Sequence, residues 1–180
     1  MGTYLGIYGG LFHLMNHTIV KALLFLSAGA VMYITGTRKM SELGGLARRA
    51  PITAFCFFIG ALAIGGLPPF NMFMSKFTLF TAAAQAGLLW ATVISVFTEL
   101  LTAACFVRAA FLIFWGEPRG AAAEATLAHA DGGEMRVPPS MLIPMLVLAL
   151  LTILLGIYPG LAHGLLDSAT NCILKILGGV

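Results

Sequence analysis

Charged residues are scarce in this sequence. Asp, Glu, Lys and Arg make up 9% of its 180 residues, whereas hydrophobic residues make up 59%. A soluble globular domain carries about 25% charged residues, so the composition excludes that class and predicts a membrane protein. The ten basic and seven acidic residues give a formal charge of +3, but they are scattered in ones and twos. This scatter argues against nucleic acid as a partner, because nucleic-acid binding needs a concentrated basic surface.

Catalytic and metal-binding motifs are also lacking. The sequence has no grouping of nucleophile and base, no phosphate-binding glycine loop and no metal-ligand spacing. Its cysteines, Cys56, Cys105 and Cys172, lie far apart in apolar surroundings and are predicted to be packing residues. His129 and His163 stand alone in polar segments and are assigned no role. We therefore expect no catalytic, cofactor or metal site in this chain, and no removable signal peptide.

Long apolar stretches are what the sequence has instead. A helix needs about 20 mostly apolar residues to cross a bilayer, and stretches of this size recur along the chain. They predict an all-α integral membrane helical bundle of about five transmembrane helices with one broken helix. The predicted spans are residues 11–34, 52–67, 70–86, 88–115 and 140–158.

The segments outside these spans differ in charge. The connection 35–50 holds four basic residues and one acid, which favours the cytoplasmic side by the positive-inside rule. The Ala- and Gly-rich stretch 116–139 is predicted to be an exposed loop. Residues 1–160 thus form one predicted membrane domain, and residues 161–180 a predicted amphipathic tail helix at the membrane surface or against a partner. The apolar positions of this tail are Leu161, Leu165, Ala169, Cys172 and Ile176.

The broken helix is predicted at Pro68 and Pro69. The segment Gly65-Gly66-Leu67-Pro68-Pro69 lacks two backbone donors and cannot continue a regular helix. Lys76 follows closely, so its ammonium is predicted to lie near the free carbonyl groups of the unwound backbone. Helix breaks at membrane depth mark ion sites in transporters. The alternative is that Lys76 is a helix-end lysine that snorkels to the interface.

Three titratable residues form a row in the first span. His13, His17 and Lys21 are spaced four residues apart, so each is rotated about 40° and raised about 6 Å from the one before. Ionisable residues inside membrane spans are costly and usually functional. With Asn16 and Thr18 beside them, the three side chains predict a proton relay. The alternative is that the histidines cap or cross-link neighbouring helices.

The fourth span contains two full charges. Glu99 lies about midway along it and needs either a proton or a cationic partner, for which Lys21 and Lys76 are the candidates. Arg108 lies half a turn away in azimuth and near the end of the span. It is predicted to snorkel to the interface. The predicted relay therefore comprises His13, His17, Lys21, Lys76 and Glu99.

Three ordered motifs carry a family resemblance. They are FHLMNHTIVKALLFL at residues 12–26, GGLARRAP at residues 44–51, and GLPP at residues 66–69 followed by Ser75-Lys76. Together they resemble the antiporter-like membrane subunits of respiratory complex I. The same superfamily includes the subunits of Mrp-type sodium/proton antiporters and of energy-converting hydrogenases and formate hydrogenlyases.

The resemblance implies roles for four of the relay residues. Lys21 resembles the family's central lysine, His13 and His17 its connecting histidines, and Lys76 its broken-helix lysine, where some members carry glutamate. Family members contain two inverted helical repeats, each with one broken helix, and this chain resembles the second repeat only. Glu99 matches no family motif, so its predicted role rests on burial alone.

The function implied is a proton-translocating subunit of a complex I-like NADH:quinone oxidoreductase or a membrane-bound hydrogenase complex, in which other subunits transfer electrons. A subunit of an Mrp-type sodium/proton antiporter is the alternative, and a non-conducting structural fragment is a further one. The expected partners are other membrane subunits, the lipid bilayer and protons, with sodium as the alternative ion. The expected location is a bacterial or archaeal cytoplasmic membrane, which the chain crosses several times.

Overall fold

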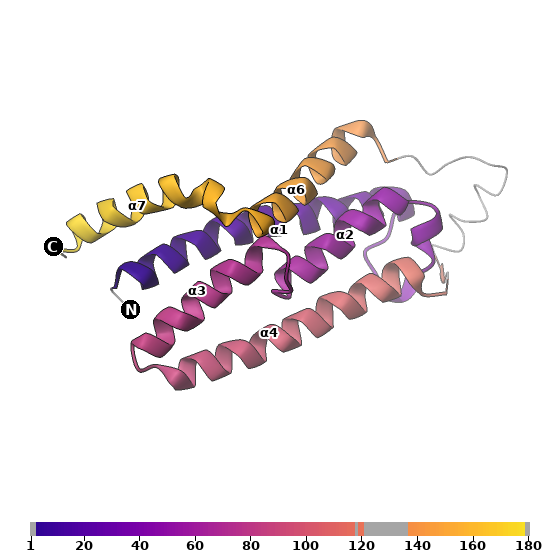
Figure 1. Ribbon diagram of the computed structural model, residues 1–180. Coiled ribbons are helices and arrows are strands. Elements are labelled where there is room, and N and C mark those ends of the chain that lie inside the picture. Colours follow the sequence, from indigo (N-terminus) through magenta and orange to yellow (C-terminus); the bar gives the residue numbers. More distant parts are fainter. Residues whose placement is uncertain (1–2, 118, 121–136, 179–180) are drawn as a thin grey trace.

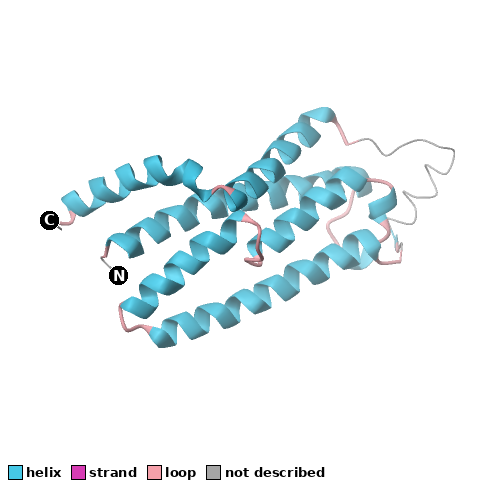
Figure 2. Cartoon of the chain, viewed as in Figure 1, coloured by secondary structure: helices cyan, strands magenta, loops and turns pink. Residues whose placement is uncertain are grey.

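Helices make up almost all of the part of the chain that the structure describes. The computed structural model describes residues 3–117, 119–120 and 137–178, and this part holds helices and loops without a strand (Figure 2). Its main helices are α1 (Tyr4–Thr35), α2 (Pro51–Ile64), α3 (Asn71–Gln85), α4 (Leu89–Ala110), α6 (Pro139–Ile157) and α7 (His163–Ile176). Short helical turns are η1 (Met40–Glu42), η2 (Leu46–Arg48), η3 (Phe111–Trp115) and η4 (Pro159–Ala162). The predicted all-α bundle is confirmed.

Helix α1 is the centre of the bundle. It packs against α2, α3, α6 and α7 and runs along most of the length of the molecule (Figure 1). Its side chains Val20 and Leu24 join Phe57 of α2 and Phe114 of η3 in one apolar core. With 32 residues, α1 is about 48 Å long, which exceeds the hydrocarbon thickness of about 30 Å.

Helix α1 begins earlier than the sequence predicts. The expected span starts at residue 11, but the helix starts at Tyr4 because the Thr3 side chain accepts a hydrogen bond from the Gly6 amide at 3.3 Å and caps the first turn. The glycines that follow do not break the helix. A Cβ at Gly9 would lie 3.2 Å from Thr78 Cγ2, so this glycine allows α1 and α3 to approach closely.

The break separates two short helices, α2 and α3. The two helices have 14 and 15 residues and are therefore about 21 and 22 Å long, each too short for the hydrocarbon core. They run one after the other in the same direction (Figure 1). The predicted spans 52–67 and 70–86 thus correspond to two short helices in line, one on each side of the break. Between them Gly66 has φ +71°, a conformation that favours glycine.

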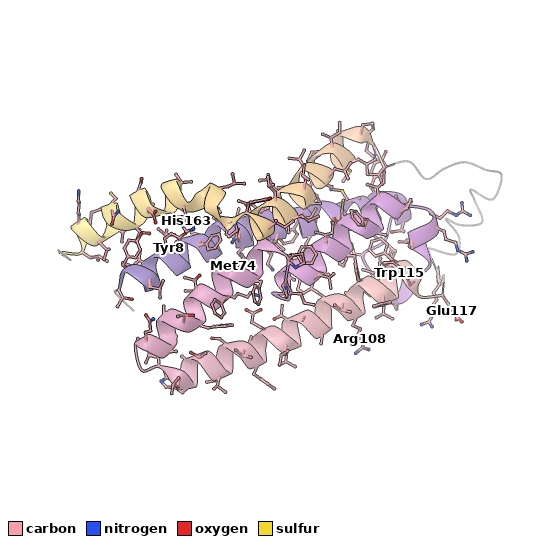
Figure 3. The ribbon with its side chains drawn as sticks, viewed as in Figure 1. Tyr8, Met74, Arg108, Trp115, Glu117 and His163 are labelled. Atoms are coloured by element: carbon pink, nitrogen blue, oxygen red, sulfur yellow. The ribbon has the colours of Figure 1, made fainter. Side chains whose placement is uncertain are left out.

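Three helices of the described part are long and apolar enough to cross a membrane: α1, α4 with its continuation η3, and α6. The outer face of α4 is apolar and exposed, with Trp90, Phe97 and Leu101 more than half accessible. Arg108 projects away from the bundle (Figure 3), in keeping with the predicted snorkelling. Most of the predicted loop 116–139, including His129, lies outside the described residues.

Helix α7 lies against the first turns of α1. Its residues Leu166 and Thr170 are buried. The Tyr8 hydroxyl lies 2.7 Å from His163 Nδ1, and these two side chains meet between α1 and α7 (Figure 3). The Tyr4 hydroxyl donates a hydrogen bond of 2.7 Å to the Asp167 carboxylate. His163, which the sequence leaves without a role, therefore helps to anchor the tail.

The apolar positions of the tail do not pack against the described part of the chain, and its predicted place at the membrane surface or against a partner stays a prediction. Leu161, Leu165 and Ile176 are 64%, 71% and 78% exposed, because α7 turns its hydrogen-bonding side toward α1. The apolar positions are thus left facing outward. The prediction for the cysteines holds in part, since Cys56 is buried and packs in the core, whereas Cys105 and Cys172 are exposed.

Helix α6 passes directly over the break. A Cβ at Gly156 would overlap the carbonyl oxygen of Pro69 and would lie 2.6 Å from the carbonyl carbon of Phe70. These neighbours are backbone atoms, which cannot rotate away as a side chain can. The absence of a side chain at Gly156 is therefore required for α6 to cover the break.

We predict that Gly156→Ala lowers the free energy of unfolding by about 1 to 3 kcal/mol, because the added methyl group forces α6 away from the break. Denaturant unfolding of the full chain in detergent measures the change. Gly10→Ala is the matched control, since a Cβ at Gly10 meets nothing within 4 Å. A loss of equal size in both variants would contradict the close packing at Gly156.

Candidate functional site

The break places Lys76 at the end of α2. Lys76 is 5% exposed, and its Nζ donates a hydrogen bond of 2.6 Å to the carbonyl oxygen of Ile64. In a continuous helix this carbonyl would accept from the amide of residue 68, but Pro68 has no amide hydrogen. The lysine thus satisfies a carbonyl group that the break leaves free, as the sequence predicts.

Gly66 makes room for this lysine. A Cβ at Gly66 would lie 3.1 Å from Lys76 Cδ and 3.3 Å from Lys76 Nζ. Any larger residue at position 66 would press on the aliphatic part of Lys76, besides being strained by the positive φ. Gly66 therefore permits the backbone conformation of the turn and leaves room for the ammonium group.

Glu99 of α4 forms an ion pair with Lys76. The side chain of Lys76 is 7% exposed and that of Glu99 30% exposed, so the pair lies at the edge of the core. Of the two cations that the sequence offers to Glu99, the structure therefore selects Lys76. A cavity of about 140 Å³ adjoins the pair and is lined by Phe73, Phe77 and Leu100 among others. Since one water occupies about 30 Å³, the cavity has room for a few waters.

The histidines of α1 lie close to this pair. The ring centres of His13 and His17 are 5.8 Å apart. His13 Nδ1 lies 3.4 Å from the Ser75 hydroxyl, and Ser75 immediately precedes Lys76. His13 therefore lies beside the turn of α3 that carries Lys76. The structure therefore brings four of the five predicted relay residues into one region.

Lys21 lies at the far end of the row. It follows His17 by one helical turn, is half-buried, and forms no ion pair with any residue in the described ranges. An ammonium group at membrane depth is costly unless polar groups or water surround it. The surface of α1 around Lys21 therefore needs cover from segments other than those described.

Asn71 and Ser75 were given no role by the reasoning from sequence. Asn16 is fully buried and donates to the carbonyl of Asn71 at 3.0 Å, while the Asn71 side-chain amide donates to Asn16 Oδ1 at 3.1 Å. This reciprocal pair joins α1 to α3, so Asn16 is a structural clamp and not a free member of the relay. The sequence did indicate that both residues could matter, because Asn71 and Ser75 are polar residues spaced four apart in the same apolar segment as Lys76.

A metal site is not formed by these residues. Within residues 3–117, 119–120 and 137–178, no group of three or more His, Cys, Asp or Glu side chains could hold a metal ion. The arrangement consists instead of proton donors and acceptors: two imidazoles, an ammonium, a carboxylate, a hydroxyl and a backbone carbonyl released by the break. Such a set can bind and pass protons.

Comparison with known proteins shows which family has this arrangement of residues. A family described as "NADH:quinone oxidoreductase/Mrp antiporter, TM" matches residues 1–102, which include the histidine row, the break, Lys76 and Glu99. The chain belongs to this family. The prediction made from the three motifs is thereby confirmed.

Members of several branches are similar to the chain. An NADH-quinone oxidoreductase subunit of Desulforudis audaxviator is 35% identical over 161 residues, which cover 88% of this chain and 32% of that protein. Hydrogenase-4 component B of Escherichia coli is 38% identical over 165 residues, covering 86% and 23%. An Na(+)/H(+) antiporter subunit of Alkalihalophilus pseudofirmus is 35% identical over 154 residues, covering 86% and 29%. The chain thus spans between 23% and 32% of the length of these curated relatives.

Two solved structures share the fold. A chain of the Mrp complex from Dietzia superposes with a TM-score of 0.78 at 31% identity, covering 93% of this chain and 38% of that one. A chain of the membrane-bound sulfane sulfur reductase, an archaeal respiratory membrane complex, superposes with a TM-score of 0.73 at 29% identity, covering 97% and 33%. The chain is therefore an antiporter-like integral membrane protein of the complex I, hydrogenase and Mrp family.

We predict that Lys76→Met and Glu99→Leu each lower the free energy of unfolding by about 2 to 3 kcal/mol, because each leaves a charge without its partner in a partly buried site. The double variant removes both charges, so its loss in free energy of unfolding should be smaller than the sum of the two single losses. Denaturant unfolding of the full chain in detergent measures the three values.

The matched control cycle combines Lys76→Met with Arg108→Leu, which removes an exposed charge from the same helix as Glu99. The losses in free energy of unfolding caused by these two changes should be additive. Additive losses for Lys76 and Glu99 as well would contradict a direct interaction between them.

Proposed function

We propose that this chain is the proton-conducting part of a membrane subunit in a redox-driven complex of the NADH:quinone oxidoreductase or hydrogenase type. Protons pass through His13, His17, Lys21, Lys76 and Glu99, and electron transfer takes place in other subunits. The observation that carries this proposal is the Lys76–Glu99 ion pair, held at a helix break beside the two histidines. The bilayer and neighbouring membrane subunits are the partners, and a bacterial or archaeal cytoplasmic membrane is the location.

The chemistry of the site supports proton transfer. The Lys76 ammonium is held by two acceptors, the Ile64 carbonyl and the Glu99 carboxylate. When Glu99 takes up a proton, the ammonium loses its counter-charge and becomes a better acid. Its proton can then pass to a water and on to His13, beside Ser75. Glu99 then gives its own proton to the neutral Lys76 amine, which restores the ion pair after one proton has passed from Glu99 to His13. Each step moves one proton between groups that are already close together.

A sodium/proton antiporter is the second candidate function. It is favoured by the superposition on a chain of the Mrp complex and by the similarity to an Na(+)/H(+) antiporter subunit. Both functions use the same titratable residues. Co-purification separates them, because iron–sulfur or nickel–iron subunits support the first and small membrane subunits alone support the second. A purely structural role is disfavoured, since Lys21 is a costly charge in a span and forms no ion pair with the described residues.

We predict that Lys21→Ala lowers proton transfer by about 100-fold or more, because the row loses a group that binds and releases protons. Proton uptake by proteoliposomes containing the assembled complex measures the effect. Arg108→Ala is the matched control: it also removes one positive charge from a span, but from a side chain that points away from the bundle (Figure 3). Assembly of both variants is checked by co-purification. Transfer at the wild-type rate in assembled Lys21→Ala complex would exclude Lys21 from the relay.

We also predict that the purified 180-residue chain transports no ions by itself. The half-buried Lys21 and His17 lie on a part of α1 that needs further helices to separate it from lipid, because ionisable groups facing hydrocarbon cost several kcal/mol. Liposomes containing the chain should show no proton or sodium flux under an imposed gradient. Flux that disappears in the Lys21→Ala variant would show that these helices are sufficient.

A further inference from the structure

One side of α1 is left open by the other described helices. Its exposed positions between residues 10 and 25 are Gly10, Leu14, Thr18 and Phe25, and of these Leu14 and Phe25 are 63% and 73% exposed. At about 100° per residue the four positions fall on one stripe of the helix. Lys21 lies in the middle of this open stripe. Helices α2, α3, α6 and α7 pack on the other sides of α1.

The histidine row runs from the bundle onto the open stripe. His13 faces α3, since its Nδ1 lies 3.4 Å from the Ser75 hydroxyl. Residues four apart on a helix are rotated by about 40°, so His17 and then Lys21 turn progressively away from α3. The row therefore ends with an ammonium group on the open side of α1.

Lys21 is too deep to reach the membrane surface. Helix α1 runs from Tyr4 to Thr35, so Lys21 lies about 25 Å from one end and about 21 Å from the other. Lysines snorkel to the interface only near the ends of a span. Charged groups deeper in a membrane protein face its interior and pair with other groups. Lys21 therefore needs a partner at its own level.

The four acids of the described residues already have partners. They form ion pairs with other cations or accept a hydrogen bond from Tyr4. These acids are Glu42, Glu99, Glu117 and Asp167. The other acids of the chain lie in residues 121–136, outside the described residues. The counter-charge of Lys21 is thus not supplied by the described helices.

The open stripe suits a further membrane helix. Backbone that faces lipid at membrane depth must be helical. A Cβ at Gly10 would meet nothing within 4 Å, so the packing of the described helices does not require this glycine. Glycine on the face of a membrane helix lets another helix approach closely.

Charge complementarity decides which group this helix brings. Lys76 lies in the same bundle and is neutralised by the carboxylate of Glu99 from a neighbouring helix. Lys21 presents the same ammonium group at membrane depth, but without an ion-pair partner among the described residues. An Asp or Glu opposite Lys21 would remove its net charge from the hydrocarbon in the same way.

We propose that a membrane-spanning helix from outside these 180 residues docks on the open stripe and pairs an Asp or Glu carboxylate with Lys21. Gly10 and Thr18 let the two helices approach, and Leu14 and Phe25 pack on either side of the ion pair. The inference concerns a residue of the proposed relay, but it rests on charge balance alone. It therefore stands whether or not protons pass through Lys21.

Carbodiimide cross-linking of the assembled complex tests the proposal. A carboxyl group adds to dicyclohexylcarbodiimide and forms an O-acylurea, and the neighbouring lysine amine attacks its acyl carbon. An amide bond forms, and dicyclohexylurea leaves with one hydrogen of the amine. Tandem mass spectrometry of the digested complex identifies the linked peptides. We expect Lys21 to be linked to an Asp or Glu in a membrane-spanning helix outside this chain.

Two controls accompany this experiment. The Lys76–Glu99 pair is the internal control, because its link shows that the reagent reaches paired groups at this depth. Lys21→Arg is the matched variant: it keeps the positive charge, but its guanidinium is not acylated at neutral pH, so the link should be lost while the complex assembles. A Lys76–Glu99 link without any link to Lys21 would overturn the proposal. A link from Lys21 to an acid of residues 121–136 would do the same.

Photo-crosslinking gives a second measurement that does not depend on the carbodiimide. p-Benzoylphenylalanine at Leu14 should link to the same helix that carries the carboxylate, whereas at Phe97, on the exposed face of α4, it should not. Linkage of position 14 to lipid alone would overturn the docking. Proton uptake by the Lys21→Ala complex bears on the relay only, so failure of the proposed function and failure of this docking are distinguishable.

Discussion

The structure depends on the need of unwound backbone at membrane depth to find hydrogen-bond partners. Pro68 removes the donor that would have served the Ile64 carbonyl, and no lipid can replace it. Lys76 donates to this carbonyl instead, and it thereby brings a positive charge into the core. That charge in turn requires Glu99 from another helix. A single missing amide hydrogen therefore leads, through two further contacts, to the polar site of the bundle.

Three helices meet the break by different interactions. Helix α1 is joined to α3 by the Asn16–Asn71 pair, α4 contributes Glu99, and α6 covers the break at Gly156 with backbone against backbone. Two of these contacts are polar, and the third is the close approach of the α6 backbone at Gly156 to the backbone of the break. The break is thus fixed from several sides, which is what a site needs if its donors and acceptors are to keep their distances while protons move between them.

The sequence predicts this part of the molecule well where one local rule decides the outcome. The break follows from two adjacent prolines, and the histidine row follows from helical spacing. The partner of Glu99 could not be chosen between Lys21 and Lys76, because it depends on how α4 packs in three dimensions. The start of α1 was misjudged, because glycine-rich turns persist as helix when they pack closely. The side of α7 that faces α1 could not be predicted from the sequence, because it depends on the hydrogen bonds of His163 and Asp167 to α1.

The length of the titratable row limits how far the proposed relay reaches along α1. From His13 to Lys21 the row rises about 12 Å, less than half of a hydrocarbon layer about 30 Å thick. The residues of α1 beyond Lys21, toward the basic connection, offer no further titratable side chain until Tyr33. In the proposed relay, a proton that reaches Lys21 would therefore leave α1 sideways. The proposed path would then turn within the plane of the membrane and would not follow the helix axis.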